Sequence, residues 1–190
     1  MFGKLDFRKH IHLVLFVIAA AAGAMGIFML VDRPATDIQG SSSRASASEN
    51  KNKIAADFDI PAVGGGNICL KDYRGKVVIL DFWSIACGPC IEANKKLQSM
   101  YDEYGKMGLQ IIGLSIDRNI LDVENFLKKN PIKYPVGLVT DDVIKGYGGI
   151  FGIPQTFVLD REGRIVKRYE GYSELSAYQM EKMVKKLLAQ

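Results

Sequence analysis

The sequence has few of the residues that bind metals or build disulfide frameworks. Both histidines, His10 and His12, lie in the first dozen residues, and the only cysteines are Cys69, Cys87 and Cys90. A structural zinc site needs about four Cys or His ligands, and a framework of disulfides needs a larger, even number of cysteines. The composition therefore argues against a zinc site and against a small fold held together by disulfides.

The sequence also lacks a strong excess of either charge. Its net charge is +4, and residues 1–53 hold seven Lys or Arg and four Asp or Glu, a surplus of three. Residues 54–190 hold the remaining eighteen Lys or Arg and seventeen Asp or Glu. A nucleic-acid surface needs a basic stripe, so this nearly neutral region predicts no nucleic-acid partner.

Charged residues are absent from one long apolar stretch, residues 11–31. A helix needs roughly 20 apolar residues to cross a bilayer, so we expect a transmembrane signal-anchor helix here, in the lipid bilayer of the cytoplasmic membrane. Basic residues precede the stretch at Lys4, Arg8 and Lys9. Because positive charge stays on the cytoplasmic side, residues 1–10 should be a cytoplasmic N-terminus, and the rest should face the periplasm or the extracellular side.

A cleaved signal peptide is the alternative for the same stretch, because Ala20, Ala21 and Ala22 offer small residues for cleavage. The apolar run continues beyond them through IFMLV, which favours an uncleaved anchor. Residues 32–53 are polar, rich in serine and free of aromatic residues. They cannot bury a core, so we expect a flexible linker.

From residue 54 onward, the pattern alternates between strands and helices. KVVILDFW and LQIIGLSID are nearly continuous apolar runs, which is typical of strands buried on both faces of a sheet. Helical patterns follow both runs, and PQTFVLD with IVKRYEG indicates a hairpin before a closing amphipathic helix. Residues 54–190 are therefore expected to form an α/β domain with a mixed sheet flanked by helices.

Cys87 and Cys90 stand where the first buried run passes into a helix. The free N–H groups and the dipole of a helix N-terminus favour a thiolate at Cys87. Pro89 suits the first helical turn, where its missing N–H costs little. We expect Cys87 to be the more exposed sulfur, with Cys90 behind it and close enough to bond to it.

The residues around this pair resemble the active site of thioredoxin-fold oxidoreductases. The resemblance rests on DFW and CGPC, and on GIPQTFVLD downstream. It implies a thioredoxin-like fold whose redox centre is the disulfide between Cys87 and Cys90, with no bound cofactor.

Longer phrases are similar to the membrane-anchored TlpA/ResA-like branch, also called the redoxin or AhpC/TSA-like group. These phrases are LKDYRGKVVILDFW and FGIPQTFVLDREGRIV, supported by the apolar stretch and by an extra helix expected around residues 121–130. The resemblance covers nearly all of residues 54–190. It implies a thiol–disulfide oxidoreductase that works outside the cytoplasmic membrane.

When the roles of the family's residues are carried over to the matching positions, the resemblance implies that Cys87 is the nucleophile and Cys90 the resolving thiol. Gly88 and Pro89 are the insert between them. It makes Asp81 the buried acid beneath the disulfide. A buried carboxyl with a raised pKa can take the proton of the resolving thiol. The alternative is an acid at the end of the strand, bonded to backbone amides.

The resemblance also places Pro154, after Ile153, as a cis-proline beside the active site. The backbone of Ile153 would then be exposed to pair with an incoming client strand. An ordinary trans turn is the alternative. Trp83 either covers the site or is an aromatic residue of the core.

Two residues raise further questions. Ala86 precedes Cys87, where this family usually has an aromatic residue, so the loss of a flat contact surface affects the docking of partners but not the chemistry. Cys69 should turn away from the core by the alternation in NICLK. We interpret it as a small half-buried residue, and a regulatory or intermolecular cysteine is the alternative.

The expected function is a membrane-tethered disulfide reductase for exported proteins. Its partners would be disulfide-containing client proteins, such as apocytochrome c, and a membrane thiol that donates electrons. The Asp at position 81 and the Gly-Pro insert, both as in thioredoxins, favour this reducing direction.

Three alternative functions fit the sequence less well. A peroxiredoxin-like thiol peroxidase would need a single Cys framed by Thr and Pro with Arg nearby, and no such frame is present. A copper-binding chaperone of thioredoxin fold usually adds a histidine, which residues 54–190 lack, although methionines could replace it. A purely structural disulfide would close too short a loop to restrain the unfolded chain.

Overall fold

The computed structural model of the chain describes residues 53–190. The predicted cytoplasmic N-terminus at residues 1–10, the predicted membrane span at residues 11–31 and nearly all of the predicted linker at residues 32–53 lie outside the described residues. Within residues 53–190, no helix is both long enough and apolar enough to cross a membrane.

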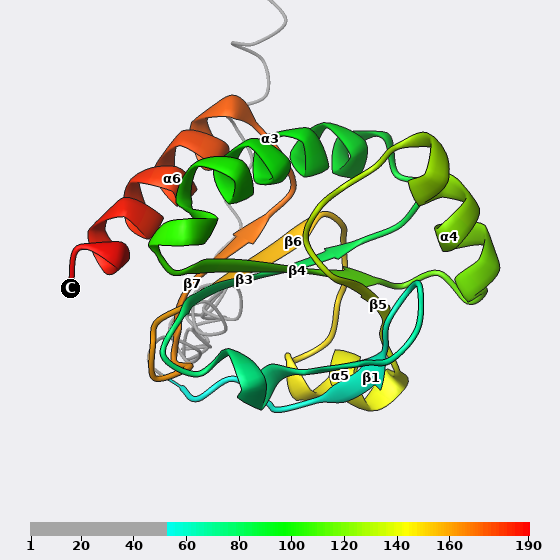
Figure 1. Cartoon of the computed structure of the whole chain (residues 1–190), viewed down its shortest axis with the longest axis horizontal. Coiled ribbons are helices and arrows are strands. Elements are labelled where there is room, and N and C mark those ends of the chain that lie inside the picture. Colours follow the sequence, from blue (N-terminus) through cyan, green and yellow to red (C-terminus); the bar gives the residue numbers. More distant parts are fainter. Residues whose placement is uncertain (1–52) are drawn as a thin grey trace, which may run out of the picture. The chain divides into compact units, whose positions relative to one another are not determined.

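A five-stranded sheet forms the centre of the domain, with the strand order β5-β4-β3-β6-β7 (Figure 1). The strands are β3 (Val77–Trp83), β4 (Leu109–Ser115), β5 (Val136–Leu138), β6 (Gln155–Leu159) and β7 (Ile165–Glu170). β3 pairs parallel with β4 and antiparallel with β6. The sheet is therefore mixed, and the predicted α/β architecture is confirmed.

β3 lies in the middle of the sheet because its sequence is apolar on both faces apart from Asp81. All of its residues are buried. Side chains alternate along a strand, so its odd-numbered apolar residues pack into one hydrophobic cluster and its even-numbered ones into another. By the same alternation, Asp81 falls on the face of the first cluster.

Three helices cover the face of the first cluster, and a short helix with a small hairpin covers the opposite face (Figure 1). The three helices are α3 (Gly88–Tyr104), α4 (Ile120–Lys129) and α6 (Glu174–Leu188). The opposite face is covered by α5 (Asp141–Gly146) and by the antiparallel pair β1 (Asp59–Pro61) and β2 (Asn67–Cys69). Two 3-10 helices, η2 (Leu70–Tyr73) and η3 (Gly105–Met107), complete the described elements.

Each α-helix within residues 53–190 begins at a residue whose side chain accepts a hydrogen bond from a free N–H group of the first turn. These residues are Cys87 for α3, Asn119 for α4, Thr140 for α5 and Ser173 for α6. Such caps stabilise a helix start. Gly108, at φ 106°, turns the chain from η3 into β4 in a left-handed conformation that favours glycine. Local sequence therefore determines where these elements start.

The first described residue, Lys53, is hydrogen-bonded to the end of the sheet opposite to Cys87. The carbonyl of Lys53 accepts the N–H of Ile165 at 2.8 Å, at the start of β7. β7 begins beside the end of β6, and β6 ends beside the start of β3. Cys87 comes after a short loop at the other end of β3, so the two points are separated by about the length of that strand, roughly 20 Å at about 3.3 Å per residue.

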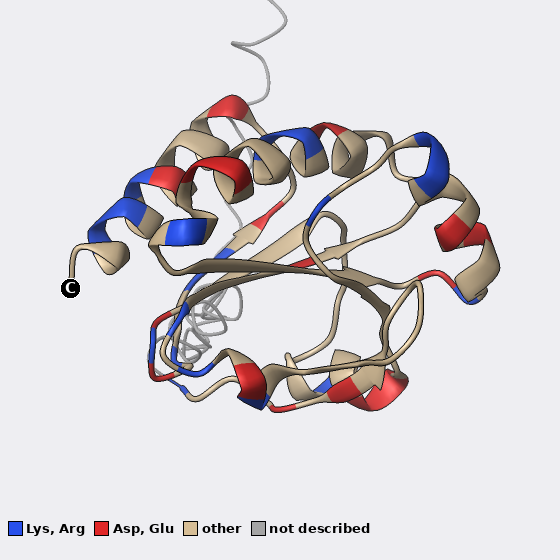
Figure 2. Ribbon diagram, viewed as in Figure 1, with Lys and Arg blue, Asp and Glu red and all other residues tan. Residues whose placement is uncertain are grey.

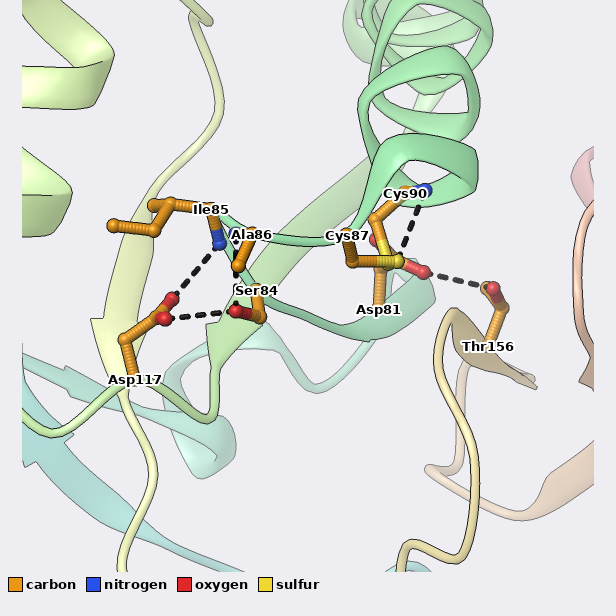
Figure 3. Close-up of a disulfide and its surroundings, with 8 residues drawn as sticks. All are labelled: Asp81, Ser84, Ile85, Ala86, Cys87, Cys90, Asp117 and Thr156. Carbon is orange, nitrogen blue, oxygen red and sulfur yellow. Dashed lines mark hydrogen bonds between the residues drawn. A yellow bond between two sulfur atoms is a disulfide. The ribbon is translucent and has the colours of Figure 1, made fainter.

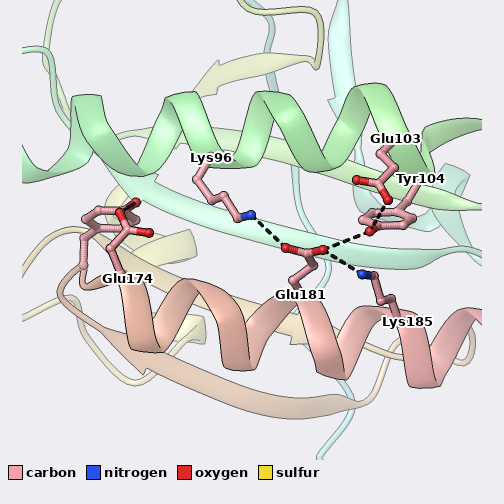
Figure 4. Close-up of polar contacts among 7 residues, drawn as sticks. Lys96, Glu103, Tyr104, Glu174, Glu181 and Lys185 are labelled. Carbon is pink, nitrogen blue, oxygen red and sulfur yellow. Dashed lines mark hydrogen bonds and ion pairs between the residues drawn. The ribbon is translucent and has the colours of Figure 1, made fainter.

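Charged side chains of both signs are spread over the helices and outer turns (Figure 2). One group of them joins α3 to α6 (Figure 4). Glu181 forms ion pairs with Lys96 at 2.7 Å and Lys185 at 2.9 Å, and the hydroxyl of Tyr104 donates to it at 2.9 Å. The hydrogen bond from Lys96 and then that from Lys185 lower the pKa of Glu181 to about 2. The ionised carboxylate therefore ties the two long helices together.

Glu181→Gln is expected to lower the free energy of unfolding at pH 7 by about 1 kcal/mol, a value discounted for solvent screening. The folded-state pKa of Glu181 lies below its ordinary value of 4.5. Its contribution is therefore complete above about pH 4.5 and is lost as the pH falls toward 2. Urea unfolding, followed by the fluorescence of Trp83, measures the difference at both ends of this range.

Glu92→Gln is the matched control, because in the described part of the chain Glu92 forms an exposed ion pair with Lys95 on α3 and no other. If the two variants lost the same stability at pH 7, the role given to Glu181 would be wrong.

Candidate active site

The two cysteines of the CGPC motif form a disulfide at the start of α3 (Figure 3). Cys87 is the N-cap residue, and its Sγ accepts a hydrogen bond from the backbone N–H of Cys90 at 3.2 Å. Cys87 is partly exposed, whereas Cys90 is completely buried. The predicted order of exposure is confirmed, and Cys87 is the sulfur that another protein can reach.

Gly88 and Pro89 form the first turn of α3 between the cysteines, and both are exposed. The free N–H groups of a helix start and the positive end of the helix dipole lie at Cys87. Proline has no N–H that a hydrogen bond would have to satisfy there. When the disulfide is reduced, this position favours the thiolate of Cys87 over its thiol.

Asp117, two residues after β4, holds the loop between β3 and Cys87. Its Oδ1 accepts the Ser84 hydroxyl at 2.7 Å, and its Oδ2 accepts the Ile85 N–H at 3.0 Å (Figure 3). Ser115, completely buried at the end of β4, donates to the same Oδ2 at 2.7 Å. The carbonyl of Ser84 in turn accepts the N–H of Cys87 at 3.1 Å. One carboxylate therefore fixes the backbone that carries the reactive sulfur.

Asp81 is completely buried within the sheet, among the residues that surround the disulfide in Figure 3. Its Oδ1 accepts the hydroxyl of Thr156 at 2.8 Å, and its Oδ2 has no hydrogen-bond partner among the described residues. Burial raises the pKa of Asp81 to about 7, although the hydrogen bond from Thr156 offsets part of the effect.

The alternative environment for Asp81, a strand end with backbone amides as partners, is wrong. Asp81 lies inside β3, and its hydrogen-bond partner is a side chain. A carboxyl group that titrates near neutral pH can accept and return a proton during a reaction. The structure therefore gives Asp81 the properties of a general acid and base, while its use as one stays a prediction.

The peptide bond between Ile153 and Pro154 is cis, as predicted. β6 begins at the next residue, which pairs with the penultimate residue of β3. Pro154 therefore lies at the end of the sheet that carries Cys87. Ile153 is partly exposed, and its backbone forms no hydrogen bond within the described part of the chain. Its pairing with a client strand stays a prediction.

Trp83 is completely buried and packs against Phe126 of α4, with ring centroids 5.7 Å apart. It shares its hydrophobic cluster with Cys90. Of the two interpretations of Trp83, the aromatic core residue fits this placement. Its indole supports the site from the core and does not cover the disulfide from the solvent side.

Ala86 is exposed and presents no ring beside the disulfide. Cys69 is partly buried, while its neighbours Ile68 and Leu70 are buried, as the alternation predicted. Cys69 forms no disulfide.

Four polar residues of the site were not identified from the sequence: Ser84, Ser115, Asp117 and Thr156. A signal was present for the first three, because they lie at or just after the carboxyl ends of β3 and β4. The carboxyl ends of neighbouring parallel strands meet at one edge of a sheet. Thr156 gave no such signal, because only the register between β3 and β6 places it opposite Asp81.

The site contains the pair of sulfurs that disulfide exchange uses, one partly exposed and one buried and bonded to it, and a buried acid lies beside them. As to metals, residues 53–190 contain no cluster of three or more His, Cys, Asp or Glu side chains that could hold an ion.

Comparisons with known proteins agree with this chemistry. Residues 52–168 match the model of the AhpC/TSA family. The thiol-disulfide oxidoreductase ResA of Bacillus thuringiensis subsp. konkukian is 33% identical to this chain over 136 residues, which cover 71% of this chain and 77% of that protein.

Solved structures are similar over the same region. StoA from Bacillus subtilis superposes with a TM-score of 0.57 at 28% identity, covering 68% of this chain and 96% of that one. A thiol:disulfide interchange protein of the thioredoxin family from Chlorobium tepidum superposes with a TM-score of 0.66 at 25% identity, covering 73% of this chain and 97% of that one. The predicted thioredoxin-like fold is confirmed.

Asp81→Asn is expected to raise the free energy of unfolding at pH 8 by about 2–4 kcal/mol, since a shift of roughly three pKa units corresponds to at most about 4 kcal/mol. The folded-state pKa of Asp81 lies above its ordinary value of 3.8. The wild type therefore loses stability as the pH rises from about 4 to about 7, and the gain should vanish below that range. Urea unfolding of the oxidised chain measures both limits, with exposed Asp122→Asn as the control. Equal stability of wild type and Asp81→Asn at pH 8 would contradict the burial argument.

Asp117→Ala is expected to lower the free energy of unfolding by about 2 kcal/mol, because it leaves the partly buried donors of Ser84, Ile85 and Ser115 without their acceptor. Asp117→Asn keeps one acceptor oxygen and should lose less. Urea unfolding measures the loss, and a turbidity assay of insulin reduction should show a slower reaction because Cys87 is less firmly placed. Asp122→Ala, on the surface of α4, is the control. Full stability of Asp117→Ala would mean that other contacts hold the loop.

Proposed function

Because this chain belongs to the AhpC/TSA family and is a thiol–disulfide oxidoreductase, we propose that it reduces disulfides in exported proteins while tethered to the cytoplasmic membrane. One observation carries the redox part of the proposal. A partly exposed Cys87 at a helix N-terminus is bonded to a completely buried Cys90, so one sulfur can exchange with a client and the other can displace that client.

The reaction follows from this arrangement. In the reduced protein, the thiolate of Cys87 attacks one sulfur of a client disulfide, and the other client sulfur leaves as a thiolate. The thiol of Cys90 then gives its proton to the carboxylate of Asp81. The thiolate of Cys90 attacks the Sγ of Cys87, and the second client thiolate leaves. Two electrons pass to the client, and the protein ends as the Cys87–Cys90 disulfide.

The buried acid gives the resolving step of this reaction a proton acceptor. Asp81 has a pKa of about 7, so part of it is a carboxylate at neutral pH and can receive the proton of Cys90. The Gly-Pro insert supports the reducing direction by its likeness to thioredoxins.

The membrane tether is supported by the uncharged stretch at residues 11–31. The described chain joins the sheet at the end opposite to Cys87, so a tether attached through residue 53 would leave the disulfide free to meet clients. After each turnover, a membrane thiol would donate electrons through the same exposed sulfur. Apocytochrome c, which needs free thiols before haem is attached, is the proposed client.

The equilibrium reduction potential of the Cys87–Cys90 pair tests the direction. In the full chain with Cys69→Ser, titration against thiol–disulfide buffers should give a value near or below roughly −230 mV, toward the thioredoxin end of the scale. Cys90→Ser is the control and should not form the internal disulfide.

A potential near roughly −120 mV would contradict the reducing direction and indicate disulfide formation instead. A pair that did not cycle between the two states at all would contradict the redox centre itself.

A further inference from the structure

The proton that Asp81 receives must leave again, and the client obstructs one exit. In the mixed disulfide, a client protein is bonded to Cys87 and covers the side of the site that faces solvent. Asp81 is completely buried beneath it. A route that releases the proton while the client is still bound therefore has to lie on another side of Asp81.

Thr156 is the residue on that other side. It lies opposite Asp81 in the register of β3 and β6, is 4% exposed, and donates its hydroxyl to Asp81 Oδ1 at 2.8 Å. A threonine hydroxyl has one hydrogen and two acceptor lone pairs. With its hydrogen on Asp81, the Thr156 oxygen can still accept a hydrogen bond from water.

A cavity reaches Thr156 from the surface. It lies between α3, α6 and the start of β6, and its volume of about 10 Å³ is close to what a single water molecule needs. Ala93, Lys96 and Ala177 line it from the two helices, and Pro154 and Thr156 line it from the sheet side. The cavity therefore reaches the residue whose hydroxyl contacts Asp81, and Cys87 is not among the residues that line it.

We propose that Thr156 is a positioning residue for Asp81, and that its hydroxyl passes the proton of Asp81 to water in the cavity between α3 and α6. This inference rests on the proposed role of Asp81 in the resolving step. Thr156 holds Oδ1, so Oδ2, which lacks a partner in the described structure, is free to take the proton of Cys90.

The step balances without another reagent. The S–H bond of Cys90 breaks, and its proton forms an O–H bond on Asp81. The carboxyl group then rotates by half a turn about its bond to Cβ, which brings the protonated oxygen to Thr156. The proton passes to the oxygen of Thr156, and the hydrogen that Thr156 carried before passes to a water molecule in the cavity. Asp81 is again a carboxylate, Thr156 is again a hydroxyl, and no electrons have moved.

Other titratable groups near this path are few and belong to several elements. Cys90 on α3 is the proton donor. Tyr134, before β5, stays protonated because burial and the charge of Asp81 raise its pKa well above the ordinary value. Lys96 and Tyr172 line the cavity, and Lys96 is paired with Glu181 of α6.

The test follows one turnover of the full chain with Cys69→Ser. The reduced protein is mixed with insulin, quenched with acid, alkylated and analysed by mass spectrometry, so that formation and decay of the mixed disulfide are measured separately. Thr156→Val should form the mixed disulfide at the wild-type rate but resolve it about tenfold more slowly near pH 7. Thr156→Ser, which keeps the hydroxyl, should restore resolution to within about twofold.

The pH profile separates positioning from packing. Thr156→Val removes a donor to the carboxylate, so the midpoint of the rise in resolving rate with pH should move upward by roughly one unit. Thr156→Ser should leave the midpoint in place. Ala177→Val, which narrows the cavity without touching Asp81, should slow resolution and leave the midpoint unchanged.

The outcomes distinguish this inference from the proposed function. Slow resolution in Asp81→Asn together with wild-type resolution in Thr156→Val would overturn the inference and leave the role of Asp81 intact. Wild-type resolution in Asp81→Asn would overturn the role of Asp81 itself. Wild-type resolution in Ala177→Val would overturn the route through the cavity. If Thr156→Val did not fold, Thr156→Ala would take its place with the same expected results.

Discussion

The site depends on one constraint, which is that β3 is buried on both faces and lies in the middle of the sheet. A strand in this position has to leave the core where it ends, and here a short loop, residues 84–86, leads from β3 to the start of α3. Cys87 therefore lies at a helix N-terminus, where free N–H groups favour its thiolate. Cys90, one turn further on, points back into the core. The difference in exposure between the two sulfurs is a consequence of this single change from strand to helix.

The same burial explains why Asp81 lowers the stability of the fold and is at the same time suited to proton transfer. A carboxyl within a fully buried strand is forced toward its neutral form, which raises its pKa to about 7. An ionised Asp81 destabilises the fold at neutral pH, whereas a group that titrates near neutral pH is suited to exchange a proton with a thiol. Stability is lowered here at the residue that the proposed chemistry needs, as is common at functional sites.

The parts of the site that keep these groups in place come from distant segments of the chain. Asp117 holds the loop before Cys87 from the end of the neighbouring parallel strand. Thr156 holds Asp81 from the antiparallel strand on the other side. The central strand is thus supported from both of its neighbours, and Thr156 also lines the small cavity between α3 and α6.

The sequence by itself determined the order of strands and helices, the place of the CGPC motif between a buried strand and a helix, and the greater exposure of Cys87. Hydrophobic periodicity and the rules for helix starts are local properties, so they can be read along the chain. The cis peptide before Pro154 was predicted by resemblance, whereas the residues alone left a trans turn open.

Only the tertiary structure decided which polar groups meet at the site. Asp81 and Thr156 are 75 positions apart, and Ser84 and Asp117 are 33 apart. Their contacts depend on strand register and on the crossover between β3 and β4, which no local pattern specifies. The placement of Trp83 in the core was decided in the same way, because a buried aromatic residue and one that covers a site have the same sequence pattern until the packing of α4 is known.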